Sequence, residues 1–179
     1  MQEKVENLKQ KIWITRKSRI NAEKRLIRQE KLIQYLNIWY AILLSLISLY
    51  SLVYNVNKNI SIISVVLSFG ITMVSIYFSN QNLSIRAENM KKNYINLQSL
   101  NFEIDSEEYI NNKKLKEFQD KYIKILNDCE NHENIDYYEV MKDDDKKIYC
   151  KYIFLKLMEI LIKGLYFIFP IILIILLRR

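Results

Sequence analysis

Apolar and polar residues are segregated into long blocks along this chain. Two apolar blocks, 35–54 and 60–79, hold 20 residues each, contain no Asp, Glu, Lys, Arg or His, and are separated only by residues 55–59. A helix of 20 residues rises about 30 Å, the thickness of the hydrocarbon core of a bilayer. Aromatic residues stand near the ends of the blocks, where their amphipathic rings favour the headgroup region. The pattern predicts a transmembrane helical hairpin over residues 35–79.

The polar segments on either side of this hairpin predict long helices. The chain has only two Gly and one Pro, and all three lie in apolar blocks, so the polar segments lack these helix breakers. Between residues 80 and 129, apolar positions recur every three or four residues along two stretches, which predicts two packed helices. The segment Asp105–Glu108 has a capping-box pattern, so we expect the second helix to start there.

The last apolar block, residues 152–179, is of a different kind. Its uncharged part, from Gly164 to Leu177, holds only 14 residues, or about 21 Å of helix. Upstream of it, Lys156, Glu159 and Lys163 lie on one helical face. The block is either a third span, whose intramembrane charges point into a bundle or a water-filled path, or an interfacial helix on the cytoplasmic leaflet. We favour the third span.

These patterns define the expected fold class and its parts. We predict an all-α membrane protein in which a two-span transmembrane helical hairpin is continuous with long cytoplasmic helices, followed by a C-terminal hydrophobic helix. The parts are a basic cytoplasmic helix (1–34), the transmembrane hairpin (35–79), a cytoplasmic helical region with a connector (80–151), and the C-terminal hydrophobic helix (152–179).

The distribution of charge orients the hairpin. The chain carries a net charge of +7, and residues 1–34 contain ten Lys or Arg against four Glu. Residues 80–151 contain twelve Lys or Arg against fifteen Asp or Glu. Because short cytoplasmic flanks carry the excess of Lys and Arg, we expect a cytoplasmic N-terminus. The first apolar block is too long and starts too late for a signal peptide, so we expect an uncleaved anchor.

The basic residues that precede the first block have two main interpretations. They can contact anionic lipid headgroups, an interaction worth about 1 kcal/mol per residue near the surface. Alternatively, they belong to a solvated helix that only sets the topology, while binding of nucleic acid is the least favoured reading. The candidates for headgroup contact are Arg16, Lys17, Arg19, Lys24 and Arg25.

A stripe of small hydroxyl residues runs along one face of the second block, at spacings of three and four, with a weaker counterpart in the first block. Small residues let membrane helices approach closely, and their hydroxyls bond across the contact. If oligomerisation points the same face at a central axis, the hydroxyls line an aqueous pore. The candidates for pore lining or helix packing are Ser61, Ser64, Ser68, Thr72, Ser75, Ser45 and Ser48.

Enzymatic chemistry has little support in this sequence. It has one His and lacks a Gly-rich phosphate loop, G-x-S-x-G and H-E-x-x-H, so we expect no enzyme, no catalytic residues and no cofactor. Glu130, His132, Glu133 and Asp136 resemble a polar loop with scattered carboxylates more than a metal centre, and we expect no metal. We expect the two cysteines to be isolated reduced thiols.

Two stretches of the chain resemble a known family. The segment WITRKSRINAEKRL, Trp13–Leu26, leads into the hairpin, and ENHENIDY, Glu130–Tyr137, follows the cytoplasmic helical region. Over roughly residues 10–140 the pattern resembles the SMODS- and SLOG-associating two-transmembrane effector family, SLATT. The resemblance implies a bacterial anti-phage effector of the inner membrane that forms a pore when a partner signals infection. Partners in that family's neighbourhoods include nucleotidyltransferases that make nucleotide second messengers, nucleotide sensors and reverse transcriptases.

Our leading hypothesis is therefore a homo-oligomeric membrane effector of anti-phage defence that forms or gates a pore. Its expected partners are membrane lipid, further copies of itself and a component of the defence system, whereas nucleic acid is not expected. Two alternatives stay open. One is a non-conducting membrane anchor or adaptor that recruits a soluble partner through its cytoplasmic helices, and the other is a holin-like lysis protein.

Overall fold

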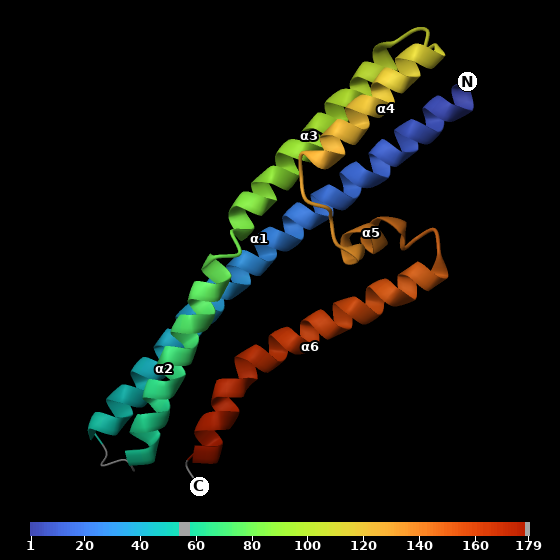
Figure 1. Cartoon of the computed structure of the whole chain (residues 1–179). Coiled ribbons are helices and arrows are strands. Elements are labelled where there is room, and N and C mark those ends of the chain that lie inside the picture. The colour runs from blue at the N-terminus through green and yellow to red at the C-terminus, as the bar shows by residue number, and fades with distance from the viewer. Residues whose placement is uncertain (54–57, 178–179) are drawn as a thin grey trace. The chain divides into compact units, whose positions relative to one another are not determined.

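The regular structure of the described residues is entirely α-helical (Figure 1). The computed structural model describes residues 1–53 and 58–177. The predicted all-α class is confirmed. The helices are α1 (Gln2–Val53), α2 (Lys58–Ser79), α3 (Leu83–Ser106), α4 (Asn112–Asn127), α5 (Asn134–Met141) and α6 (Lys146–Leu177).

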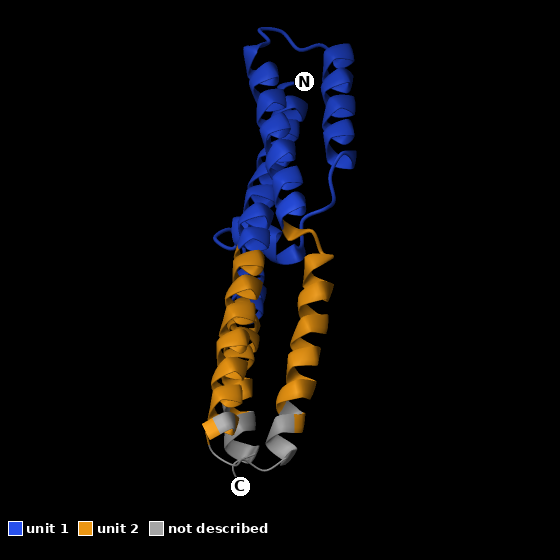
Figure 2. Ribbon diagram, turned by 90° about the vertical axis from the view of Figure 1, so that its left-hand side faces the viewer, with its two compact units in different colours: residues 1–27, 84–155 blue, residues 28–83, 156–179 orange. Residues whose placement is uncertain are grey.

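The chain divides into two compact units (Figure 2). Unit 1 comprises Met1–Ile27 and Ser84–Leu155, and unit 2 comprises Arg28–Leu83 and Lys156–Arg179. Helices α1 and α6 each contribute one part to either unit, so two of the three division points fall inside an unbroken helix, and the third follows the first residue of α3. The predicted division of the chain into residues 1–34, 35–79, 80–151 and 152–179 stays a prediction.

Unit 1 has an apolar core that joins α1, α3 and α4. The three- and four-residue spacing in α3 predicts a seam of Leu83, Ala87, Met90, Tyr94 and Leu97; Ala87, Met90 and Leu97 are buried, whereas Leu83 and Tyr94 are half-buried. Each fully buried Leu, Ile or Phe stabilises the fold by about 1.5–3 kcal/mol, so this cluster holds the three helices together. The main cluster consists of Leu8, Ile12, Leu97, Leu100, Ile104, Leu115 and Phe118.

The turn between α3 and α4 differs from the predicted one. We expected a helix start at Asp105–Glu108, but α3 continues through Ser106, because Ile104 is still part of the buried core. Helix α4 begins later, at Asn112, and Asn111 is its N-cap, with a side chain that accepts a hydrogen bond from the backbone N–H of Lys114 at 2.8 Å. Asn is among the best N-cap residues, and this cap competes successfully with the predicted one.

Unit 2 contains parts of α1, α2 and α6 that contact one another through a few specific interactions. Ser75 on α2 donates a hydrogen bond to the Asn37 side chain on α1 at 2.8 Å. The Tyr40 hydroxyl donates to the backbone carbonyl of Tyr166 on α6, also at 2.8 Å. A void of about 20 Å³ lies where the three helices meet, and it is lined by Tyr40, Leu43, Leu44, Ile47, Leu67, Ile71, Phe169 and Pro170.

Large apolar side chains cover much of the outer surface of unit 2, among them Leu46, Val66 and Leu165. Soluble proteins rarely expose apolar patches of this extent. Within the described part of the chain, α1 is long and apolar enough over Gln2–Ser51 to cross a membrane, judged by length and composition, and none of its most apolar stretch is buried. The buried core helix of a soluble protein would show the opposite.

Candidate functional site

The best-defined polar site of unit 1 is a buried ion pair between α1 and α5. Arg25 donates from Nε to Oδ1 of Asp136 and from Nη2 to Oδ2, each at 3.0 Å, which makes a bidentate pair. Its remaining nitrogen, Nη1, lies 2.8 Å from Oε1 of Glu133. Asp136 is 2% exposed and Arg25 is 8% exposed, so both charges are out of water. We call this group of three residues the Arg25 junction.

The Asp136 carboxylate in this junction also organises the start of α5. Its Oδ2 accepts a hydrogen bond from the backbone N–H of Glu133 at 3.0 Å, next to the first turn of the helix. Burial by itself would lower the pKa of Arg25, but the hydrogen bonds and charge of Asp136 outweigh burial and raise that pKa, so the guanidinium keeps its charge. Breaking such a buried pair by removing one partner is strongly destabilising, because an uncompensated charge stays behind.

Further polar contacts join the same part of α1 to α5 and to the last turn of α4. Asn21 donates to the carbonyl of Asp136 at 3.2 Å, and Arg19 donates to the carbonyl of Leu126 at 3.3 Å. These contacts join residues that are 115 and 107 positions apart in the chain. The two stretches whose pattern suggested a family, 13–26 and 130–137, therefore meet in unit 1. Spacing along the sequence carries no signal for such a long-range pairing.

The basic residues predicted to contact lipid headgroups fall into two groups. Arg19 and Arg25 are buried, Nη2 of Arg19 donates to a protein carbonyl and the guanidinium of Arg25 donates to a carboxylate, so these two lack the exposure that headgroup contact requires. This corrects the expectation for both, because a run of basic residues does not reveal which of them will fold against a distant acceptor. Lys17 and Lys24 are exposed and Arg16 is half-buried, and for these three headgroup contact stays a prediction.

The polar loop before α5 uses its carboxylates in ion pairs. Glu130 accepts from Nε of Arg86 at 2.7 Å, and Glu133 pairs with Arg25. His132 is half-buried, and burial lowers its pKa, so the imidazole is neutral at pH 7. Among the residues that the structure describes, no three His, Cys, Asp or Glu side chains gather as a metal site would require.

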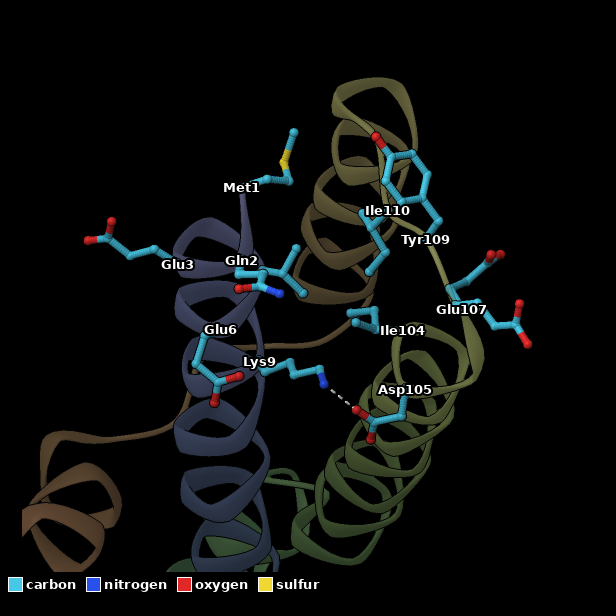
Figure 3. A pocket seen from close by; sticks show the side chains of 12 residues that line it. Met1, Gln2, Glu3, Glu6, Lys9, Ile104, Asp105, Glu107, Tyr109 and Ile110 are labelled. Atoms are coloured by element: carbon cyan, nitrogen blue, oxygen red, sulfur yellow. Dashed lines mark ion pairs between the residues drawn. The ribbon is translucent and has the colours of Figure 1, made fainter.

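An open cavity of about 610 Å³ lies between the first turns of α1 and the turn that joins α3 to α4 (Figure 3). Lys9 projects into it and pairs with Asp105. The lining holds five carboxylates against Lys9 and the amino group of Met1, and this excess of negative charge disfavours phosphate groups as ligands. Sequence reasoning missed this cavity, because its two acidic segments are a hundred positions apart. Its carboxylates belong to Glu3, Glu6, Asp105, Glu107 and Glu108.

The hydroxyl stripe of α2 is divided between two environments. Ser75 is half-buried and bonds across to Asn37 of α1. Ser68 and Thr72 are exposed, and their hydroxyls donate to backbone carbonyls of their own helix at 2.8 and 2.9 Å, so one part of the stripe faces away from the neighbouring helices. Ser64 is half-buried, whereas the side chain of Ser61 lies outside the described residues.

The counterpart of this stripe in α1 is also exposed. Ser45 and Ser48 are exposed, and the Ser45 hydroxyl donates to the carbonyl of Ala41 in its own helix at 2.9 Å. A hydroxyl that is bonded to its own helix carries little cost in an apolar environment, since its donor is already satisfied. Both blocks therefore present polar groups outward that need no partner within the protomer.

Helix α6 presents its charges to the protein and its apolar residues outward. Glu159 accepts from Nζ of Lys156 at 3.1 Å and from Nζ of Lys163 at 2.5 Å, and the three side chains are only 31, 27 and 32% exposed in chain order. The apolar side chains of the same turns, Ile160 and Leu165, are 62 and 64% exposed. Soluble helices have the reverse pattern. The expected common face of the three charges is present, and it points inward.

An all-helical chain with exposed apolar helices and inward-facing charges has the character of a helical membrane protein. The chain matches, over residues 1–177, the family described as SMODS and SLOG-associating 2TM effector domain family 5. It belongs to this family of transmembrane effector domains, and the resemblance noted from residues 10–140 is confirmed and extended through α6. Neither a curated protein nor a solved structure matches the chain.

Proposed function

We propose that this protein is a homo-oligomeric effector of bacterial anti-phage defence that lies in the inner membrane and permeabilises it when a partner signals infection. The observation that carries the proposal is the inverted surface of unit 2, where Lys156, Glu159 and Lys163 face the protein while apolar residues face outward. Water is a poor solvent for such a surface, and lipid is a good one. Membership of a family of transmembrane effector domains supports the effector role.

The proposed topology has a cytoplasmic N-terminus, two spans at 35–79 and a third span in α6. The Tyr40–Tyr166 hydrogen bond supports the third span, because it sets the apolar part of α6 beside the first block. Further along both helices, Ile47 and Pro170 line the same void. Leu177 lies eleven residues beyond Tyr166, about 16 Å further along α6, which is most of the remaining depth of the bilayer core.

The proposed conduction path is lined by the exposed part of the α2 stripe. Ser68 and Thr72 are polar groups on an otherwise apolar surface, and assembly of several copies would gather them around one axis. In the proposed closed state, the same small residues pack against one another between copies and leave no open path.

The trigger is proposed to act on unit 1. The acidic cavity is a poor site for a nucleotide, and the proposed carrier of the signal is a separate component, whether a nucleotidyltransferase, a nucleotide sensor or a reverse transcriptase. The Arg25 junction sits two residues before the point where α1 passes into unit 2. A change at α5 is therefore relayed along a helix that has no break up to Val53.

Leakage of a dye from liposomes that carry the purified full chain tests this function. We expect release to rise with the fraction of oligomer, and the Ser68→Leu/Thr72→Leu variant to release at least tenfold less. Gly70→Leu is the matched control, since Gly70 is two residues from both, faces the opposite side of α2, and has open space around an added side chain. An absence of leakage from every oligomeric state would refute the pore, and equal losses in both variants would refute the lining.

The adaptor is a second candidate, favoured by one observation. The acidic cavity of about 610 Å³ is large enough to receive basic side chains of a soluble partner. Expression of the chain alone separates the candidates when combined with the liposome assay. An adaptor leaves the membrane potential unchanged and the liposomes intact. An effector abolishes the membrane potential of the cells, makes the liposomes leak, or does both. A holin-like protein produces lysis at a fixed time after induction.

A further inference from the structure

Pro170 leaves one backbone carbonyl of α6 without its helical partner. Proline has no N–H, so residue 170 cannot donate to the carbonyl four positions earlier, which belongs to Tyr166. The proline ring also crowds that carbonyl and bends the helix axis. Helix α6 changes direction in its C-terminal part (Figure 1). Pro170 therefore creates a weak point in α6 between residues 166 and 170.

Tyr40 on α1 supplies the hydrogen bond that Pro170 cannot make. Its hydroxyl donates at 2.8 Å to the carbonyl of Tyr166, the same carbonyl that the proline leaves without a donor. An unsatisfied carbonyl is costly in the hydrocarbon core, because no water is present there to replace the missing donor. Proline is tolerated in membrane helices where a neighbouring helix satisfies the freed carbonyl. One hydroxyl of α1 thus makes the proline of α6 acceptable.

The other contacts near Pro170 are apolar. Pro170 is buried, and it borders the void of about 20 Å³ where α1, α2 and α6 meet. Among the residues that line this void, Tyr40 is the one with a polar group in its side chain. Apolar contacts have no preferred direction, so they allow one helix to move against another. The Tyr40 hydrogen bond is therefore the directional contact that fixes this part of α6.

We propose that Pro170 is a hinge in α6 and that the Tyr40 hydroxyl is the latch that holds this hinge closed against α1. When the latch is released, the segment beyond the hinge, through Leu177, swings away from α1. Helices α1 and α6 both pass from unit 1 into unit 2, so a shift of one relative to the other stretches this hydrogen bond. Tyr40 is a positioning residue. The inference rests on the membrane placement in the proposed function and does not require conduction.

Distances between spin labels, measured by electron paramagnetic resonance in liposomes, test the hinge with the full chain. One pair of labels, at Leu46→Cys on α1 and Ile172→Cys on α6, lies beyond the latch. A reference pair, at Ile38→Cys and Leu165→Cys, lies before it. All four side chains are exposed, so the labels leave the packing intact. The native cysteines are replaced by serine, and labelled chains are diluted with unlabelled ones so that each distance is measured within one copy.

We expect Tyr40→Phe to release the hinge, because it removes the hydroxyl and keeps the ring. Ile172 lies six residues beyond Tyr166, or about 9 Å of helix, so a swing of about 30° should widen the distance distribution of the Leu46 pair by about 5 Å. The distances of the reference pair should not change. Adding Pro170→Ala to Tyr40→Phe should restore the narrow distribution, because the new residue has an N–H that can donate to the Tyr166 carbonyl.

The control is Tyr35→Phe, which removes an exposed hydroxyl from the same helix and should change neither pair. Unchanged distances in Tyr40→Phe, or a widening that persists when Pro170→Ala is added, would overturn the latch. Equal widening at both pairs would mean that Tyr40 docks the whole of α6, and it would overturn the hinge. A wild-type chain that does not float with liposomes in a density gradient would instead overturn the proposed membrane function, and the latch with it.

Discussion

Removal of the Asp136 charge is the sharpest test of how unit 1 is held together. Asp136→Asn keeps the size of the side chain and an oxygen that can accept from the Glu133 backbone, but it leaves the buried Arg25 guanidinium without its bidentate partner. Loss of one partner from a buried ion pair costs about 3–5 kcal/mol. The remaining bridge to Glu133 adds only about 0–1 kcal/mol, because that carboxylate is 59% exposed and screened by water. We expect unit 1 to lose about 3 kcal/mol of unfolding free energy.

Urea titration of the full chain in mild detergent measures this loss. Trp13 lies in unit 1, so its fluorescence in a Trp39→Phe background reports that unit specifically. The control is Lys92→Gln, which breaks an exposed pair with Glu88 at 2.7 Å and should leave the urea midpoint unchanged, because water screens that pair.

A double-mutant cycle separates pairing from other effects of the substitution. The Arg25→Met/Asp136→Asn variant removes both charges, so its cost should fall short of the sum of the single costs by about 2 kcal/mol or more. Single costs below 1 kcal/mol, or single costs that simply add, would refute the claim that the junction stabilises unit 1.

Two further predictions concern reactivity and topology. Burial raises the pKa of the Cys129 thiol, whereas Cys150 is exposed, so iodoacetamide at pH 7.5 should label Cys150 at least about tenfold faster than Cys129. Mass spectrometry of the timed reaction measures both rates, and faster labelling of Cys129 would refute its burial. If α6 crosses the bilayer, alkaline phosphatase fused after residue 179 should lie outside the cytoplasm and be active, whereas the same enzyme fused after residue 83 should lie in the cytoplasm and be inactive. Inactivity of both fusions would indicate that α6 lies on the cytoplasmic leaflet.

The helices were accessible to sequence reasoning because their causes are local. Runs of 20 uncharged residues, the scarcity of Gly and Pro, and the three- and four-residue spacing of apolar positions each act within a few turns. The buried positions of α3 at 87, 90 and 97 follow from that spacing. The start of α4 did not follow, because two segments there offered caps, and only the packing of Ile104 decided which was used.

The polar sites were less accessible, because their partners are distant in the chain. Arg25 and Lys24 are neighbours with the same charge, yet one is buried in an ion pair and the other is exposed. What separates them is an aspartate 111 positions further along. The three charges of α6 were easier, since spacings of three and four residues place them on one face, and their apolar surroundings imply that this face turns inward.

Helix α1 runs from a segment that packs in the core of unit 1 to an apolar segment with exposed side chains, and the Arg25 junction lies just before this change. Its first half follows soluble rules, with Leu8 and Ile12 buried in a core, and its second half follows membrane rules, with apolar residues such as Leu46 exposed. A helix without a break transmits a change in one half to the other, provided that the first half is firmly held. The Arg25 junction is the last strong attachment before the division at residue 27. Asp136→Asn should therefore change how leakage depends on the trigger, whereas substitutions on the hydroxyl stripe should change leakage itself.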